Sequence, residues 1–299
     1  MLSKIYQILL IMTAVLALNN RVNADDQRSY KLIHNSPSNG AWAIALSRIR
    51  EPLSQSLRRP LIIESYVGGH GTLAINKYQG LDDPRAFIVL GPTVHTILPK
   101  VQKVDYTVDN LEPLLLLAIT PWCYAVRGDT KNLDFKTFLA DTKGGFYGSQ
   151  LNFSMENLLM MHINRQENLG QTMVNYKSHP DIARGILQGD VHWAIVPRWL
   201  CSSKTNSSTV VISLESVSEK YDLDYWFSLS YFGLFAKKNT DSRIKSEFVD
   251  AFIDAWWKNQ EYVNRNFAFP NRVVRGEEFR KHVDAFAQRI APLLKSKND

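Results

Sequence analysis

Three segments of the sequence bring small and hydrogen-bonding residues to places where a strand-like run gives way to a helical one. They are residues 34–42, 91–95 and 148–154. In parallel α/β sheets, ligands bind off the carboxyl ends of the strands, where helix N-termini offer unpaired N–H groups and a positive dipole end. The chemistry that such segments support is the binding of a carboxylate or another anion. An ordinary capped helix is the alternative for each segment.

The sequence holds no pattern of residues that marks a catalytic or cofactor site. No two of the seven histidines stand four residues apart, as they do in a zinc-binding helix. No Gly-x-Ser-x-Gly elbow, phosphate-binding loop or Gly-x-Gly-x-x-Gly follows a strand-like run. Lys177, directly after Tyr176, could act as a catalytic base. We therefore expect a binding protein without a metal or another cofactor, and an enzyme is the alternative.

Strand-like and helix-like runs alternate along most of the chain. Short apolar runs predict strands at residues 31–34, 61–64, 87–90, 114–120, 124–127, 144–149, 172–176, 192–196, 210–214 and 229–236. Helical spacing of apolar residues predicts helices at residues 44–57, 135–140, 154–166, 181–187, 241–265 and from 277 onward. Pro52 should kink or divide the first helix, because proline lacks an N–H group and clashes with the preceding turn. The alternation predicts an α/β architecture with largely parallel sheets.

The N-terminal segment has the features of an export signal. Lys4 precedes an apolar run at residues 5–18, and Val22-Asn23-Ala24 ends the segment with a cleavage pattern of small residues. We expect residues 1–24 to be removed, which leaves a soluble, exported protein. An uncleaved membrane anchor is the alternative. The longest later apolar run, residues 114–119, has the length of a buried strand.

Charge and cysteine content narrow the class of partner. The basic residues are scattered and do not alternate with aromatic residues, so nucleic acid is a weak interpretation. Removing the signal lowers the formal charge from +6 to about +4, a balance that slightly favours an anionic ligand. Cys123 and Cys201 are the two cysteines, and export would permit a disulfide between them. Two buried thiols are the alternative.

Several landmarks, in order, resemble the extracytoplasmic receptors of tripartite tricarboxylate transporters, the TctC or Bug family. Pro60-Leu61-Ile62-Ile63-Glu64-Ser65 followed by Gly68-Gly69-His70-Gly71 is similar to the family's Val-Val-Glu-Asn strand and glycine-rich turn. Tyr147-Gly148-Ser149 and Ser154 resemble its Tyr-Gly-Ser and helix cap. Later similarities are Val174-Asn175-Tyr176-Lys177, Gln188-Gly189-Asp190-Val191 and Gly276-Glu277-Glu278-Phe279. The resemblance covers residues 31–294.

The resemblance implies a type II periplasmic-binding-protein fold, in which two α/β lobes close over a small carboxylate. It implies lobe 1 at residues 25–120 and 234–299, lobe 2 at residues 121–233, and switches near Thr120 and Gly233. It also implies a periplasmic monomer that delivers a small-molecule ligand to membrane permease subunits. The ligand contacts that it implies are Ser36, Ser38, Asn39, Gly40, Ala41, Trp42, Pro92, Thr93, Val94, Gln150, Asn152, Ser154, Met155, Glu156 and Tyr176.

Departures from the family pattern lie in the expected pocket. The first loop lacks the family's Thr-Asp, and Trp42 would add bulk or a stacking face there. Glu156 stands where the family has Ser, either as a solvated capping group or as a carboxylate facing the ligand. His192 replaces an Asp near the hinge, and we interpret it as a structural histidine. A receptor for a non-carboxylate metabolite, and a sensor that feeds a two-component system, remain alternatives to transport.

Overall fold

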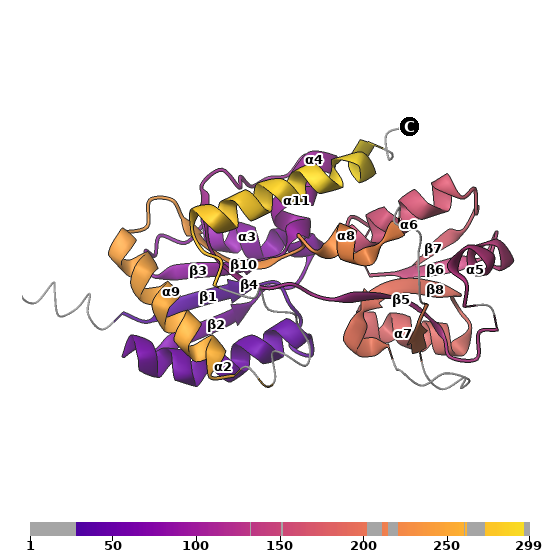
Figure 1. The fold of residues 1–299 in the computed structure, drawn as a ribbon. Helices are drawn as coiled ribbons and strands as arrows, with labels where there is room; N and C mark the ends of the chain where they lie inside the picture. The colour runs from indigo at the N-terminus through magenta and orange to yellow at the C-terminus, as the bar shows by residue number, and fades with distance from the viewer. Residues whose placement is uncertain are drawn as a thin grey trace, which may run out of the picture.

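The computed structural model describes residues 28–131, 133–150, 152–201, 211–214, 221–259, 261 and 273–295. These residues form two five-stranded sheets covered by helices, and the sheets lie side by side (Figure 1). The predicted export signal, residues 1–24, lies outside the described residues. Within the described part of the chain, no helix is both long and apolar enough to span a membrane.

The first sheet has the strand order β2-β1-β3-β10-β4. Its strands are β1 (Tyr30–His34), β2 (Leu61–Ser65), β3 (Ala86–Leu90), β4 (Leu111–Ala118) and β10 (Phe232–Lys237). β2 and β3 pair with β1 in parallel, whereas β10 runs antiparallel to both β3 and β4. Four of the five strands therefore point the same way, and only β10 returns. We call this sheet and its helices lobe 1.

The second sheet repeats the same plan with the order β7-β6-β8-β5-β9. Its strands are β5 (Trp122–Arg127), β6 (Phe146–Ser149), β7 (Thr172–Asn175), β8 (Trp193–Pro197) and β9 (Val211–Ser213). β7 and β8 are parallel to β6, and β5 runs antiparallel to β8 and β9. Here β5 is the single reversed strand. We call this sheet and its helices lobe 2, and the prediction of two α/β lobes with mostly parallel sheets is confirmed.

The chain crosses between the lobes at residues 119–121 and again at residues 228–231, and we call this region the junction. β4 ends at the junction, so the antiparallel β10 begins there, and the parallel strands β1, β2 and β3 must end there. β5 begins at the junction, so β6, β7 and β8 also end there. Four strands of each lobe therefore point their carboxyl ends toward the junction.

Helices cover both faces of the lobe 1 sheet. α2 (Ala41–Leu57) and α9 (Ser242–Trp257) pack against one another. The other helices of lobe 1 are α3 (Thr72–Gln79), α4 (Leu98–Val101) and α11 (Glu277–Lys295). α9 begins at Asp241, whose carboxylate accepts hydrogen bonds from the N–H groups of Arg243 and Ile244. Phe248 of α9 stacks on Phe87 of β3, with ring centroids 3.9 Å apart. This aromatic core fixes α9 and its neighbour α2 on the sheet.

Lobe 2 is covered by α5 (Phe135–Asp141), α6 (Met155–Gln166), α7 (His179–Gln188) and α8 (Leu223–Phe227). Asp134, Ser154 and Ser178 cap α5, α6 and α7, because each side chain accepts a hydrogen bond from an N–H group of the first turn. α7 ends at Gly189, whose φ of 82° is the left-handed conformation that glycine adopts without strain. Two of these helices, α6 and α7, begin at the junction, because they directly follow β6 and β7.

Helix α11 belongs to lobe 1 but reaches lobe 2, where it contacts α6 (Figure 1). Tyr231 in the return crossing is fully buried, and its ring packs edge-on against Phe279 and Phe286 of α11. The Arg289 guanidinium of α11 donates to the Tyr225 carbonyl and, at 3.0 Å, to Ser228 Oγ. α11 thus packs against the second crossing and is hydrogen-bonded to it.

The main differences from the predicted elements are local. Pro52 lies inside one continuous helix, α2, so the prediction that it would divide the helix is wrong. α3 and α8 were not predicted. The helix predicted at residues 241–265 is observed as α9 up to Trp257, and residues 262–272 lie outside the described part of the chain.

Candidate functional site

The loops of lobe 1 that follow β1 and β2 are tied together at the junction. The Ser36 N–H donates to His34 Nδ1 (3.1 Å), and Ser65 Oγ donates to the Ser36 carbonyl (2.7 Å). Burial lowers the pKa of His34, which favours the neutral imidazole that accepts this hydrogen bond. Ser38 and Asn39 lie exposed at the tip of the first loop, and Gly40 leads into α2. Ala41 is the first residue of that helix.

The glycine-rich turn at residues 68–71, in the loop after β2, lies against the loops that follow β1 and β3. A Cβ atom on Gly71 would stand 2.7 Å from Asn35 Nδ2 and 3.1 Å from Val94 Cβ, so this position has no room for a side chain. His70 adopts a φ of 56°, which is uncommon for a residue other than glycine. Its ring lies edge-on to Phe153 of lobe 2, with centroids 6.0 Å apart. His70 is therefore a contact across the junction that the sequence analysis treated only as a family landmark.

The loop after β3 is largely packed into the core. Pro92 and Val94 are buried, and Thr93 is half-buried. His95 Nδ1 forms a hydrogen bond with Tyr231 Oη (3.0 Å), and its ring stacks on Phe235 at 4.6 Å. Burial lowers the pKa of His95 to about 4. This histidine ties the end of β3 to the return crossing in its uncharged form.

Trp42 does not offer a stacking face to a ligand, and that prediction is corrected. The residue is 7% exposed, and its ring stacks on Phe232 (4.1 Å) and on Trp256 (5.9 Å). Both partners come from distant parts of the chain, β10 and α9. Trp42 therefore belongs to the lobe 1 core, where it secures the start of α2 behind the first loop.

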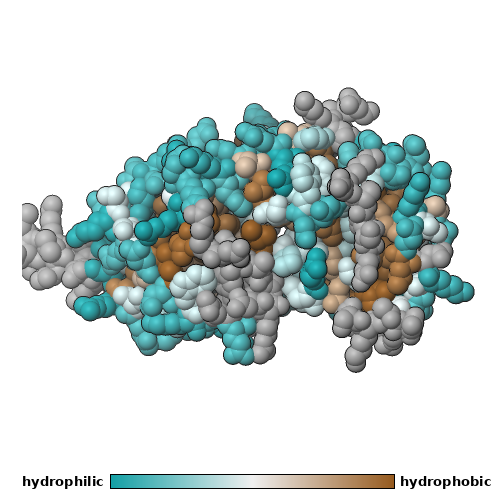
Figure 2. Space-filling view, in the orientation of Figure 1, coloured by the Kyte–Doolittle hydropathy of each residue, from teal (hydrophilic) through white to brown (hydrophobic). Residues whose placement is uncertain are grey.

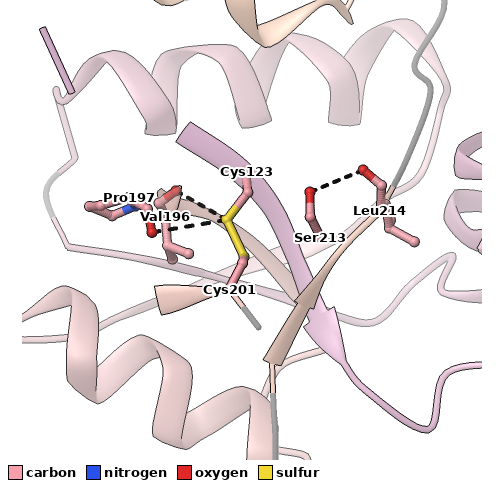
Figure 3. Close-up of a disulfide and its surroundings, with 6 residues drawn as sticks. All are labelled: Cys123, Val196, Pro197, Cys201, Ser213 and Leu214. Carbon is pink, nitrogen blue, oxygen red and sulfur yellow. Dashed lines mark hydrogen bonds between the residues drawn. A yellow bond between two sulfur atoms is a disulfide. The ribbon is translucent and has the colours of Figure 1, made fainter. Parts of the chain in front are cut away.

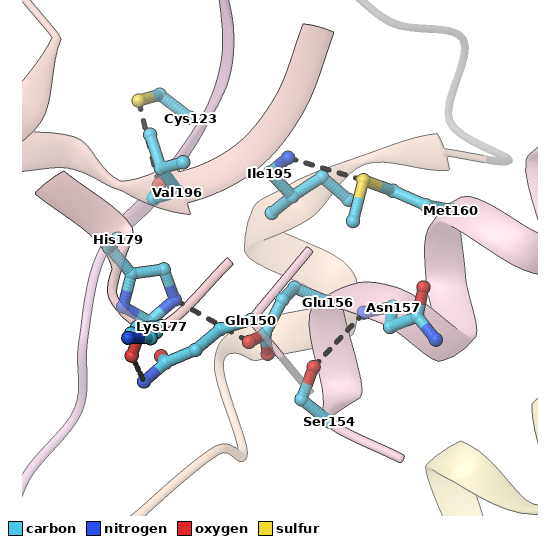
Figure 4. Close-up of polar contacts among 10 residues, drawn as sticks. All are labelled: Cys123, Gln150, Ser154, Glu156, Asn157, Met160, Lys177, His179, Ile195 and Val196. Carbon is cyan, nitrogen blue, oxygen red and sulfur yellow. Dashed lines mark hydrogen bonds and ion pairs between the residues drawn. The ribbon is translucent and has the colours of Figure 1, made fainter. Parts of the chain in front are cut away.

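In lobe 2, the loops after β6 and β7 are joined beside the start of α6 (Figure 4). Gln150 Nε2 donates to the Lys177 carbonyl (3.2 Å), which links the two loops. Ser154 Oγ accepts from the Asn157 N–H (3.3 Å), and Asn157 Nδ2 donates to the Asn152 carbonyl (2.8 Å). The structure thus brings the predicted residues Gln150, Asn152 and Ser154 together at the junction.

The first turn of α6 buries both of its predicted ligand contacts. The Met155 side chain lies in the core of lobe 2. Glu156 is also buried, so its interpretation as a solvated capping group is wrong. Its carboxylate Oε1 lies 3.5 Å from Nε2 of His179, the first residue of α7 (Figure 4). The sequence analysis did not single out His179, because nothing near it in the sequence identifies its partner.

Tyr176 is half-buried and packs along α7, and its role as a ligand contact stays a prediction. A Cβ atom on Gly185 would stand 2.2 Å from Tyr176 Oη, and one on Gly148 would stand 3.4 Å from its Cε2. The ring therefore fills the space that these two glycines leave open, and its hydroxyl points toward Gly185, well along the helix from the junction. Burial and the nearby Asp190 carboxylate raise the pKa of Tyr176.

His192 is a structural residue, but it is not near the hinge. Its Nδ1 lies 3.2 Å from the backbone N and O of Phe146, at the start of β6 and just before β8 begins. Since β6 and β8 end at the junction, their starts lie at the opposite edge of the sheet. The predicted hinge position of His192 is therefore wrong, whereas its interpretation as a structural histidine agrees with these contacts.

A disulfide joins Cys123 of β5 to Cys201, which follows the short helix η3 (Arg198–Leu200) (Figure 3). Cys123 is buried and the two Cα atoms are 6.9 Å apart. Both cysteines lie near the junction, where β5 begins and β8 ends. The disulfide therefore cross-links the edge of lobe 2 that faces lobe 1.

A cavity of ≈ 220 Å³ lies on the flank of lobe 2, between β5, β9 and α8. Its lining residues are Trp122, Cys123, Tyr124, Arg198, Ser213, Leu214, Asp222, Leu223 and Asp224. None of the predicted ligand contacts lines it. It shares Trp122 and Arg198 with the junction, but the loops that follow β1, β2, β3, β6 and β7 do not line it. The convergence of strand ends at the junction is therefore the better candidate site.

The structure is similar to solved structures of solute-binding proteins. It aligns with MatC from Rhodopseudomonas palustris with bound malate at a TM-score of 0.70 and 17% sequence identity, over 89% of this chain and 99% of that chain. A second R. palustris protein, determined with adipate, has a TM-score of 0.69 and 17% identity over 91% and 97% of the two chains. A TctC solute-binding protein from Polaromonas has a TM-score of 0.65 and 17% identity over 91% and 98%.

No family model matches the chain, and no curated protein matches it either. At this level of identity, the similarity shows the fold. The described residues therefore adopt the two-lobed fold of periplasmic binding proteins, and the resemblance inferred from the sequence is confirmed at the level of the fold.

Proposed function

We propose that this protein is a periplasmic solute-binding receptor that captures a small organic anion between its lobes and delivers it to the permease subunits of a tripartite tricarboxylate-type transporter. The observation that supports it most is the convergence of strand carboxyl ends from both lobes on the junction. Ligands in α/β proteins bind at such carboxyl ends. Malate and adipate are the ligands in two structures with this fold.

The proposed mechanism is hinge closure around the ligand. Only two short crossings, at residues 119–121 and 228–231, connect the sheets, so small backbone rotations there would move one lobe against the other. The N-terminal end of α6 would receive an anion, since its unpaired N–H groups face the junction. A ligand that contacts both lobes favours the closed form by its greater affinity for that form. We place the lobe boundaries within the two crossings.

The proposal also includes export and a binding role without catalysis. Export follows from residues 1–24, whose features are those of a cleaved signal. A binding role is consistent with the similar structures, which are periplasmic and solute-binding proteins.

A ligand screen on protein purified from the periplasm tests this function. The melting temperature would be measured with succinate, malate, adipate, citrate, benzoate, aspartate and glutamate, and with putrescine and choline as cationic probes. A ligand that binds the folded state raises the melting temperature with its concentration. We expect at least one carboxylate to stabilise the protein and to reduce its radius of gyration in X-ray scattering. Stabilisation by the cations alone, or turnover of the bound compound, would overturn the proposal.

A further inference from the structure

The Glu156 carboxylate occupies an unusual place for an anion receptor. Glu156 lies in the first turn of α6 and His179 is the first residue of α7, and both helices begin at the junction. The Glu156 side chain is 7% exposed, so a protein carboxylate stands beside the helix end where a ligand carboxylate would bind. A second anion at this point would meet like-charge repulsion in a region with little water.

The described residues leave this carboxylate without a hydrogen-bond donor of its own. Its nearest polar contact is His179 Nε2 at 3.5 Å, which is longer than the roughly 2.7–3.2 Å of an N–H···O hydrogen bond. His179 Nε2 is itself buried and has no hydrogen-bond partner among the described residues. A buried charge is stable only when it is paired and hydrogen-bonded. A donor group of a ligand that enters between the lobes would complete the pairing.

Basic side chains of this edge do not supply that donor. Lys177 and Arg198 follow β7 and β8 at the junction, and both are exposed. The Arg198 guanidinium lies 3.9 Å from the Asp224 carboxylate, on the side of α8. Within the described part of the chain, no three His, Cys, Asp or Glu side chains are grouped as metal ligands. Glu156 and His179 therefore have no third ligand with which to hold a metal ion.

Other polar groups at the junction are suited to the acidic end of the same ligand. The indole of Trp122, the first residue of β5, lies edge-on to the His179 ring, with centroids 5.5 Å apart. Trp122 is 8% exposed, and its Nε1 has no hydrogen-bond partner among the described residues. Across the junction, His70 Nδ1 is buried and likewise unpartnered in the described structure. An indole N–H group can only donate, so Trp122 suits a ligand carboxylate or hydroxyl.

We propose that Glu156, beside His179, receives the ammonium group of the ligand, so that the receptor selects amino-acid-like zwitterions over plain dicarboxylates. This inference rests on the proposed receptor function, and it names the class of ligand. The acidic group of the zwitterion lies toward the indole N–H group of Trp122. The ammonium group lies toward Glu156, where it forms a charge-assisted hydrogen bond.

Matched pairs of acids test the inference by isothermal titration calorimetry. The pairs are succinate and aspartate, glutarate and glutamate, and adipate and 2-aminoadipate, which differ within each pair only by the amino group. We expect the amino compound of the best-binding pair to bind at least tenfold more tightly. The Glu156→Gln variant should reduce that preference at least tenfold, because it keeps the shape of the side chain but removes its charge.

Asp190→Asn is the matched control, because Asp190 lies in the same lobe, after the end of α7 that is remote from the junction, and it loses the same charge. It should keep the wild-type preference. The preference is a ratio measured on one protein, so it does not depend on how much of a variant is folded. Equal affinity within the pairs, or a preference that survives Glu156→Gln, would overturn this inference and leave the receptor function standing. If no carboxylate binds at all, the receptor function fails as well.

Discussion

The junction ends of the two lobes carry different chemistry on the same strand order. In lobe 1, the three loops are small, glycine-rich and closely packed, and the buried histidines His34 and His95 have lowered pKa values that favour their neutral forms. In lobe 2, Glu156 and His179 lie 3.5 Å apart under the corresponding loops. The topology alone therefore does not determine where charge lies in the site.

Aromatic rings pack in both lobes, and the lobes differ in the disulfide of lobe 2. Lobe 1 is held by stacked aromatic rings, among them Trp42, Phe87, Phe248 and Trp256. Lobe 2 is closed at the junction by the disulfide between Cys123 and Cys201. The junction end of lobe 1 is therefore closely packed and uncharged. The junction end of lobe 2 carries the Glu156 carboxylate and is cross-linked by the disulfide. The following predictions separate these roles.

The largest effect is expected for Trp42→Ala in lobe 1. Removing a buried aromatic side chain costs about 3–5 kcal/mol of the free energy of unfolding, and urea denaturation would measure it. Trp257→Ala is the control, because Trp257 is 37% exposed and lies on the same helix as Trp256. This variant should lose well under half as much free energy of unfolding as Trp42→Ala. A variant that keeps its stability but loses ligand affinity would return Trp42 to the binding surface and break the comparison.

The next effect concerns the disulfide of lobe 2. Replacing both cysteines by alanine removes a bond between residues that are 78 positions apart. The free energy of unfolding should fall by roughly 2–4 kcal/mol, because the cross-link restricts the unfolded chain. Hydrogen exchange should show the loss of protection in β5, β8 and β9, with β1 and β3 retaining theirs.

Reduction of the wild-type protein provides the control for this prediction. Dithiothreitol should lower its stability to that of the double variant and should leave the double variant unchanged. If protection falls equally in the two sheets, the lobes unfold as one cooperative unit, and the assignment of the disulfide to lobe 2 stability is wrong.

The sequence predicts the strands well where the local pattern is strong. Phe87-Ile88-Val89-Leu90 is a continuous apolar run, and the observed β3 contains it, because a strand buried on both faces needs no alternation. α3 was missed because only Ala74, Ile75 and Tyr78 are buried in it and it follows directly on a glycine-rich turn. Eight residues with three apolar contacts give too weak a periodic signal.

The limits of prediction in the site have a common physical cause, which is that side-chain direction depends on distant partners. Trp42 turns into the core because Phe232 and Trp256, far along the chain, stack on it. Tyr176 turns along α7 because Gly185 leaves room for its hydroxyl. The loops themselves were predictable from strand-to-helix transitions. The direction of the side chains within each loop was not.

The smallest effect is a pH dependence that we assign to lobe 1. His95 has a pKa of about 4 in the folded protein, whereas an unfolded chain has a value near 6.5. Below pH 6.5 the unfolded state takes up a proton that the folded state does not, so stability falls as the pH decreases toward 4. The contribution of His95 to this loss is about 2 kcal/mol at pH 5.

Comparison of His95→Gln with the wild-type protein isolates this contribution. His34 and His282 also have pKa values lowered by burial, so both proteins should lose stability in acid. The difference between their free energies of unfolding should shrink or reverse by about 2 kcal/mol between pH 7.5 and pH 5, as measured by urea denaturation. Parallel pH profiles would mean that His95 is not held neutral. The folded protein would then accommodate a charged imidazole beside Tyr231 and Phe235. The loop after β3 would then carry a charge of its own, and the contrast between an uncharged junction end of lobe 1 and the Glu156 carboxylate of lobe 2 would no longer hold.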